Sequence, residues 1–120
     1  MKKLLLAAAL LFASYGAFAD QFDDLVTMLR RNGEKQGWVV RSNKVGRTIF
    51  IDIKLPQTGE GVTLTQAQFD ELKPMFVEMF RKSVKEENVP AFKSWNITIQ
   101  WNFVTTDGKV FKLAIAPRDL

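Results

Sequence analysis

The sequence predicts one small α+β domain, in which a four-stranded, mainly antiparallel sheet has two helices packed on one face. Three observations lead to this fold. Two segments place apolar residues at helical spacing. Each is followed by segments in which apolar and polar residues alternate, as in strands with one covered face. Polar turns divide these alternating segments into two hairpins, so the expected order is α-β-β-α-β-β.

Residues 1–19 have the composition of a cleavable secretory signal peptide. Lys2 and Lys3 precede an apolar run, and Ala17-Phe18-Ala19 gives a small-x-small cleavage site. The run is shorter than the roughly 20 apolar residues that span a bilayer, so we expect no membrane-spanning segment after its removal. We therefore expect residues 20–120 to form a single α+β domain of a bacterial protein that is periplasmic, or secreted.

The first helix is predicted to begin at Asp20, its N-cap, and to end at Gly33 in the left-handed conformation. Four apolar residues recur between them at positions i, i+3, i+4 and i+7: Phe22, Leu25, Val26 and Leu29. This spacing predicts an amphipathic helix of roughly three turns.

Residues 38–42 and 47–55 are expected to form the first hairpin, joined by a turn at 43–46. The second strand has the clearer pattern. Its apolar residues all fall on one face: Ile49, Ile51, Ile53 and Leu55. Asp52 and Lys54 point the other way, which predicts a sheet with one covered and one solvent-facing side.

The second helix has a well-defined start and an unusual interior. Thr65 is its expected N-cap, and Gln68 completes a capping box. Asn88-Val89-Pro90 is expected to end it. Pro74 lies inside the segment and has no backbone N–H, so we expect a kink or a break near Lys73.

Two long strands are expected to close the chain. Large apolar residues alternate along the first of them: Trp95, Ile97, Ile99, Trp101 and Phe103. A three-residue loop at 106–108 pairs Phe103 with Phe111 and puts every large apolar residue on one face, whereas a two-residue loop does not. Gly108 also suits the positive-φ position of such a loop, so we expect three residues in the turn.

The composition excludes several kinds of chemistry. The chain has no cysteine and no histidine, and its one tyrosine, Tyr15, lies in the leader. Ser-His-Asp and Cys-His catalysis, the usual zinc sites and a lipid anchor on cysteine are therefore excluded. No two carboxylates are spaced as a catalytic pair, and no calcium loop is present in the sequence. We expect no enzyme activity, no metal site and no cofactor.

Basic residues are concentrated between the end of the first helix and the first hairpin. Six of them are opposed only by Glu34: Arg30, Arg31, Lys35, Arg41, Lys44 and Arg47. They form either a binding patch for an acidic protein or an anionic envelope component, or a solvated surface that aids solubility. Without the two lysines of the leader the net charge falls from +4 to +2. Nucleic acid is not an expected partner, because no aromatic platform interrupts the basic residues.

The aromatic residues have two interpretations. Packed closely beneath the second helix they are simply the core. If that helix stands away from the sheet, a groove for a small apolar ligand or lipid is lined by five residues: Met75, Met79, Trp95, Trp101 and Phe103.

These observations favour a small exported binding or accessory protein without enzymatic activity. We expect it to act on a protein partner in the cell envelope, through the open face of the sheet or through strand addition at an edge. The polar face of the last hairpin belongs to that surface: Asn96, Thr98, Gln100, Asn102 and Lys112. A carrier of a small apolar ligand or lipid is the alternative function.

Overall fold

The structure is a computed structural model, and it describes residues 22–56 and 63–120. The expected leader and the expected N-cap at Asp20 lie outside these residues. The elements follow in the order α2 (Phe22–Glu34), β1 (Val39–Asn43), β2 (Thr48–Lys54), α3 (Gln66–Val84), the 3-10 turn η1 (Glu86–Asn88), α4 (Val89–Ser94), β3 (Thr98–Val104), β4 (Val110–Ile115) and the 3-10 turn η2 (Pro117–Asp119).

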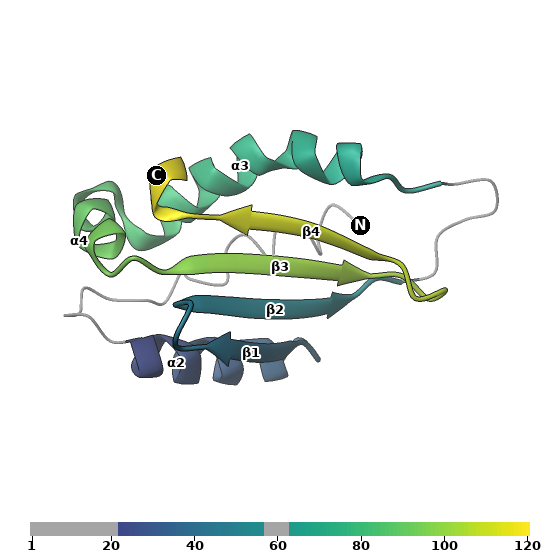
Figure 1. Cartoon of the computed structure of the whole chain (residues 1–120), viewed down its shortest axis with the longest axis horizontal. Coiled ribbons are helices and arrows are strands. Elements are labelled where there is room, and N and C mark those ends of the chain that lie inside the picture. Colours follow the sequence, from purple (N-terminus) through teal and green to yellow (C-terminus); the bar gives the residue numbers. More distant parts are fainter. Residues whose placement is uncertain (1–21, 57–62) are drawn as a thin grey trace.

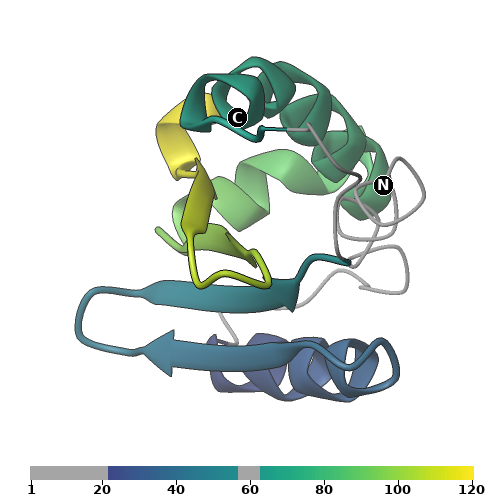
Figure 2. The ribbon, with the colours of Figure 1, turned by 90° about the vertical axis from the view of Figure 1, so that its right-hand side faces the viewer.

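The four strands form one sheet in the order β1-β2-β3-β4. β1 and β2 pair antiparallel, as do β3 and β4, whereas the central strands β2 and β3 are parallel. α2 lies along β1 and α3 along β4; in Figure 1, α3 is drawn above β4 and α2 behind β1. Both helices cover the same face of the sheet, and the other face is open to solvent (Figure 2). The predicted α+β fold, with its mainly antiparallel sheet, is confirmed.

The centre of the core lies between the sheet and α3. The isoleucines of β2 and the aromatic residues of β3 face the helices and are fully buried: Ile49, Ile51, Ile53, Trp101 and Phe103. The Phe76 ring on α3 meets the Trp101 ring edge-on, with 5.3 Å between ring centroids. Phe69 stacks on Phe103 at 4.9 Å. Each of these aromatic rings buries a large apolar area, so their burial contributes substantially to the stability of the domain.

The last hairpin has the predicted register. Phe103 pairs with Phe111, and Trp101 pairs with Leu113. Gly108 has a φ of 89°, as a three-residue loop requires at this position. The strong alternation of β3 and β4 therefore determined which loop length forms, because a slip of one residue exposes every large apolar side chain.

One helix, α4, is absent from the sequence prediction. Pro90 was expected to end a helix, but it lies in the first turn of α4, where its missing N–H needs no partner. Trp95 consequently lies at the C-terminal end of α4 instead of in a strand. Asn96 follows with a φ of 55°, and β3 begins only at Thr98.

α2 ends later than predicted. Gly33 lies inside the helix and is buried, and the left-handed residue is Gly37, with a φ of 78°. A Cβ atom on Gly33 would lie 3.2 Å from Val40 Cγ2. Gly33 therefore allows a close approach of α2 and β1, and a larger residue there would displace the Val40 side chain by a few tenths of an ångström. Gly37, not Gly33, adopts the left-handed conformation of the turn.

α3 begins as predicted and continues through its proline. The Thr65 hydroxyl accepts a hydrogen bond from the Gln68 N–H at 3.4 Å, and Gln68 Oε1 accepts one from the Thr65 N–H at 2.9 Å. Pro74 lies inside this 19-residue helix, so the expected break of the helix near Lys73 does not occur. None of the helices in the described part of the chain is both long enough and apolar enough to cross a membrane.

Candidate functional site

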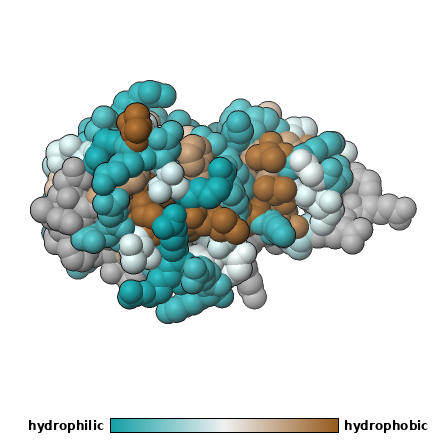
Figure 3. All heavy atoms as spheres, turned by 60° about the horizontal axis from the view of Figure 1, so that its bottom comes forward, coloured by the Kyte–Doolittle hydropathy of each residue, from teal (hydrophilic) through white to brown (hydrophobic). Residues whose placement is uncertain are grey.

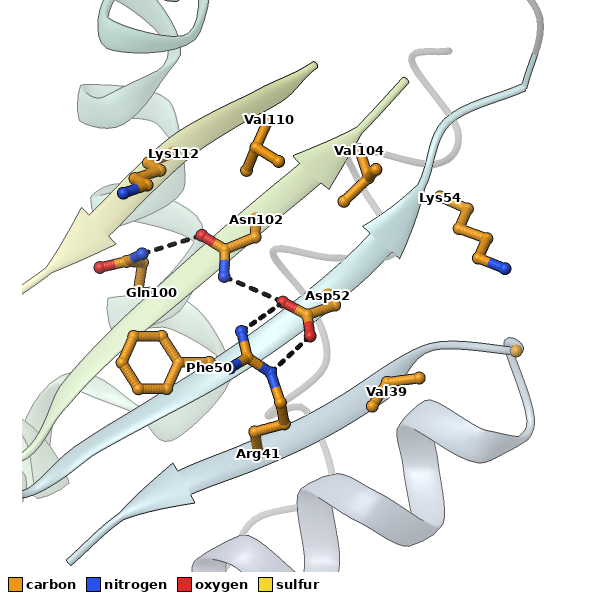
Figure 4. A pocket seen from close by; sticks show the side chains of 11 residues that line it. Val39, Arg41, Phe50, Asp52, Lys54, Gln100, Asn102, Val104, Val110 and Lys112 are labelled. Carbon is orange, nitrogen blue, oxygen red and sulfur yellow. Dashed lines mark hydrogen bonds and ion pairs between the residues drawn. The ribbon is translucent and has the colours of Figure 1, made fainter. Parts of the chain in front are cut away.

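The face of the sheet that the helices leave uncovered is the candidate site, called the open face below. Successive side chains of a strand point to opposite sides, so the residues that alternate with the core residues form this surface. They enclose a shallow concavity of about 680 Å³ that spans all four strands (Figure 4). This volume lies within the range of ligand-binding sites in proteins.

A chain of polar side chains crosses the floor of the concavity (Figure 4). Arg41 Nε donates to Asp52 Oδ2 at 2.7 Å, and Arg41 Nη2 donates to Asp52 Oδ1 at 3.0 Å. Asp52 Oδ1 also accepts a hydrogen bond from Asn102 Nδ2 at 2.9 Å. Asn102 Oδ1 in turn accepts one from Gln100 Nε2 at 2.8 Å. The network links β1, β2 and β3, because Asp52 and Asn102 are direct neighbours in the parallel register.

The network also determines the charge of Asp52. The hydrogen bonds from Arg41 lower the pKa of the Asp52 carboxyl below its usual value, and they outweigh the opposing effect of burial; the Asn102 amide lowers it further. Asp52 is therefore a carboxylate at neutral pH, and a carboxylate in this state does not donate a proton. Among residues 22–56 and 63–120, no group of three or more His, Cys, Asp or Glu side chains is placed to hold a metal ion.

Asn102 is the buried member of this network. Only 6% of it is exposed, although it lies on the side of the sheet away from the helices. Its amide donates to Asp52 and accepts from Gln100, so burial leaves neither end unbonded. A buried amide that is bonded through both its nitrogen and its oxygen holds the floor of the concavity in one arrangement.

Apolar side chains surround the polar network. The Arg41 Cζ atom lies 5.1 Å from the centroid of the Phe50 ring, a cation–π contact. Val39 and Val110 are 55% and 47% exposed, at opposite edges of the sheet. Viewed from the β1 side, apolar side chains reach the surface in groups between hydrophilic ones (Figure 3). The open face is thus a mixed surface that combines an arginine, an aromatic ring and exposed valines.

Side chains already occupy parts of both edges of the sheet. At β4, Gln66 Nε2 donates to the Lys112 carbonyl at 2.7 Å, and Gln66 Oε1 accepts from the Lys112 N–H at 3.0 Å. At β1, Arg30 Nε donates to the Val40 carbonyl at 3.2 Å. Such bonds protect edge strands from pairing with other chains. These edges therefore offer fewer unpaired backbone N–H and carbonyl groups to an added strand than a fully exposed edge would.

The six basic residues of the expected patch do not form one surface. Three of them bond within the domain: Arg30 to the Val40 carbonyl, Lys44 to Asp23 at 3.0 Å, and Arg47 to the Trp95 carbonyl at 2.7 Å. Arg41 lies on the open face with Asp52. Arg31 and Lys35 are exposed at the C-terminal end of α2 and beyond it. Of the six, Arg41 alone lines the concavity.

The structure places the five residues of the expected groove in the core or at its border. Its three aromatic members are buried: Trp95, Trp101 and Phe103. Phe76 packs against Trp101 between α3 and the sheet. Met79 packs against the core, whereas Met75 is 39% exposed. Aromatic rings thus fill the space in which an apolar ligand was expected.

The pairing of Arg41 with Asp52 did not follow from the sequence pattern. The turn of the first hairpin was expected at residues 43–46, but β1 continues to Asn43 and the turn occupies 44–47. Arg41 therefore lies opposite Phe50 and next to Asp52 across the strands. The shift changes the partners by two residues, so it preserves the faces of the strands while it alters every cross-strand pair.

The arrangement can recognise a ligand through a fixed carboxylate–guanidinium pair, amide groups and exposed apolar side chains. Among the described residues that line the concavity, Asp52 is the one carboxylate, and no serine, threonine or cysteine lies beside it as a nucleophile. In comparisons with known proteins, no family model and no curated protein matches the sequence, and no solved structure matches the structure.

Proposed function

We propose that the protein is a small binding or accessory protein of the bacterial cell envelope that acts without catalysis. It binds a protein partner with the open face of its sheet. The observation that supports this function best is the concavity itself, in which exposed valines surround a bonded network of Arg41, Asp52, Asn102 and Gln100. Arginine and aromatic residues are enriched in the centres of protein interfaces.

The shape of the site favours a macromolecular partner over a small ligand. Sites for small ligands bury most of the ligand surface, typically 70–90%. The open face contacts a ligand from one side only, because the helices lie on the other side of the sheet (Figure 2). A protein partner completes such a site by covering the concavity with its own surface.

An apolar-ligand carrier has less support. Its groove was expected between α3 and the sheet, where Phe69 and Phe76 pack against the rings of β3. The open face is apolar only in part, and its floor is polar.

Site-specific photo-crosslinking in cells tests the proposed function. A benzophenone amino acid at Val110 places the reactive group beside the concavity, whereas the same group at Val45, which is 99% exposed on the first hairpin turn, is the matched control. We expect one adduct from position 110, none from position 45, and loss of the adduct when Val39→Asp is added. An equal adduct from position 45, no adduct from position 110, or an adduct that Val39→Asp does not reduce contradicts the proposal.

A further inference from the structure

The open face carries more positive than negative charge. Asp52 is the one acidic residue that lines the concavity in the described part of the chain, and Arg41 binds it through both carboxylate oxygens. Lys54 and Lys112 line the same concavity and are exposed. Three cations and one anion leave the surface with two positive charges, and an acidic partner would complement them.

The two lysines flank a pair of valines. Val104 and Val110 are direct partners between β3 and β4, and Lys54 is the partner of Val104 on β2. Lys112 lies two residues beyond Val110, and Figure 4 shows the two lysine side chains on opposite sides of the valine pair. With strands about 4.8 Å apart and a rise of about 3.3 Å per residue, the Cα atoms of the lysines are roughly 12 Å apart.

An extended peptide has a matching repeat. Side chains at positions i, i+2 and i+4 of a strand point to the same face, and positions i and i+4 are about 13 Å apart. Two carboxylates at i and i+4 therefore span the distance between the lysines, and the residue between them lies above the valines.

We propose that the open face binds an extended acidic segment of the partner protein, in which two carboxylates four residues apart pair with Lys54 and Lys112 and an apolar residue midway packs on Val104 and Val110. This proposal rests on the proposed function and adds the chemistry of the partner. A second copy of the chain fits the site poorly, because two facing copies bring four lysines together. A lipid acyl chain also fits poorly, because on an open face one side of the chain would stay exposed to water.

Fluorescence anisotropy with labelled peptides tests the proposal. The probe contains the sequence Asp-Thr-Val-Thr-Asp, and three control peptides replace both Asp by Asn, replace Val by Ser, or bring the two Asp within two residues of each other. The protein variants are Lys54→Gln, Lys112→Gln and the double variant, with Lys93→Gln on α4 as an exposed control. Circular dichroism confirms that each variant is folded.

We expect the probe to bind more tightly than all three control peptides, and to bind more weakly as salt is added. Each lysine variant weakens binding about threefold and the double variant about tenfold, whereas Lys93→Gln leaves it unchanged. Equal binding of the Asn peptide, equal loss with Lys93→Gln, or no binding of the probe overturns the proposal. Binding to phosphatidylglycerol vesicles in place of the probe also overturns it.

The cross-linking experiment separates this proposal from the function on which it rests. If the adduct at Val110 persists unchanged in the Lys54→Gln, Lys112→Gln double variant, the open face binds a partner whose segment is not acidic. If position 110 gives no adduct in the protein that keeps both lysines, the open face is not the binding surface.

Discussion

Pro74→Ala is expected to stabilise the domain by about 2 kcal/mol. In the unbroken α3, an alanine at this position donates its N–H to the carbonyl of Asp70, a hydrogen bond that proline cannot make. Proline in a helix interior costs about 3 kcal/mol relative to alanine. This figure is a net difference between the two residues, and it already includes the roughly 0.4–1 kcal/mol by which the proline ring restricts the unfolded chain. We expect a gain of about 2 kcal/mol, below the full figure, because α3 continues through Pro74 without a break.

Thermal and urea unfolding, followed by tryptophan fluorescence, measure this gain. The emission comes from three buried tryptophans, and Trp101 contributes through its contact with Phe76 of α3. All three become exposed on unfolding, so the signal follows the whole domain. For a domain of this size, about 2 kcal/mol raises Tm by about 8–16 °C. Met75→Ala, at an exposed neighbouring position, is the control and should change the free energy of unfolding by less than about 0.5 kcal/mol. A neutral or destabilising Pro74→Ala would refute the reasoning, because the proline would then cost α3 nothing.

Three further predictions concern the network, the edge of the sheet and a backbone turn. Asp52→Asn should destabilise the domain by about 1 kcal/mol at neutral pH. Because Arg41 lowers the pKa of Asp52 in the folded state, this contribution is fully present above the unfolded-state pKa and is lost as the pH falls through the folded-state pKa. The free energies of unfolding of the two proteins in urea should therefore begin to converge as the pH falls from about 4, and a difference that stays constant argues against the ion pair. Gln66→Ala leaves the backbone N–H and carbonyl of Lys112 open to pairing with another strand. Sedimentation should therefore show self-association that grows with protein concentration, and less of it in Gln66→Glu, which keeps the acceptor for the Lys112 N–H. A Gln66→Ala protein that stays monomeric at all concentrations contradicts a protective role for Gln66. Lys85 has a φ of 70° and a ψ of 137°, a conformation that glycine adopts with less strain than lysine. Lys85→Gly should therefore raise the free energy of unfolding, measured in urea, by about 1 kcal/mol. A lower free energy of unfolding for this variant means that the turn is unstrained.

Much of the fold followed from local patterns in the sequence. Alternation fixed the covered faces of β2, β3 and β4, because a strand with one apolar side has a single way to bury it. Thr65 and Gln68 fixed the start of α3 through their own side chains. α4 was missed, because Pro90 both ends helices and begins them, and only the surrounding fold decides between the two roles. The parallel pairing of β2 with β3 depends on contacts between distant segments, which no local pattern encodes.

The candidate site was predictable only in outline. The solvent-facing side of the sheet followed from alternation, and Asp52, Asn102 and Lys112 were correctly placed on it. The partners of these residues did not follow, because they depend on strand order and on the register of the first hairpin. Clustering of basic residues along the sequence was a poor guide to clustering in space, since a helix, a turn and a strand point their side chains in different directions.

The parallel pair at the centre of the sheet has a consequence for the order in which the domain folds. Each hairpin closes a short loop, but the contact between Thr48 and Thr98 joins residues that are fifty positions apart. Closing the long loop between β2 and β3 costs more chain entropy than closing either hairpin, and this cost comes before the contacts form. The hairpins should therefore form first, and β2 should join β3 last. The Asp52–Asn102 bond crosses this same junction, so the polar network of the open face is completed in the final step. A partner of the proposed kind would bind only molecules in which this junction has closed, and it would stabilise them by an amount that grows with its concentration relative to its Kd.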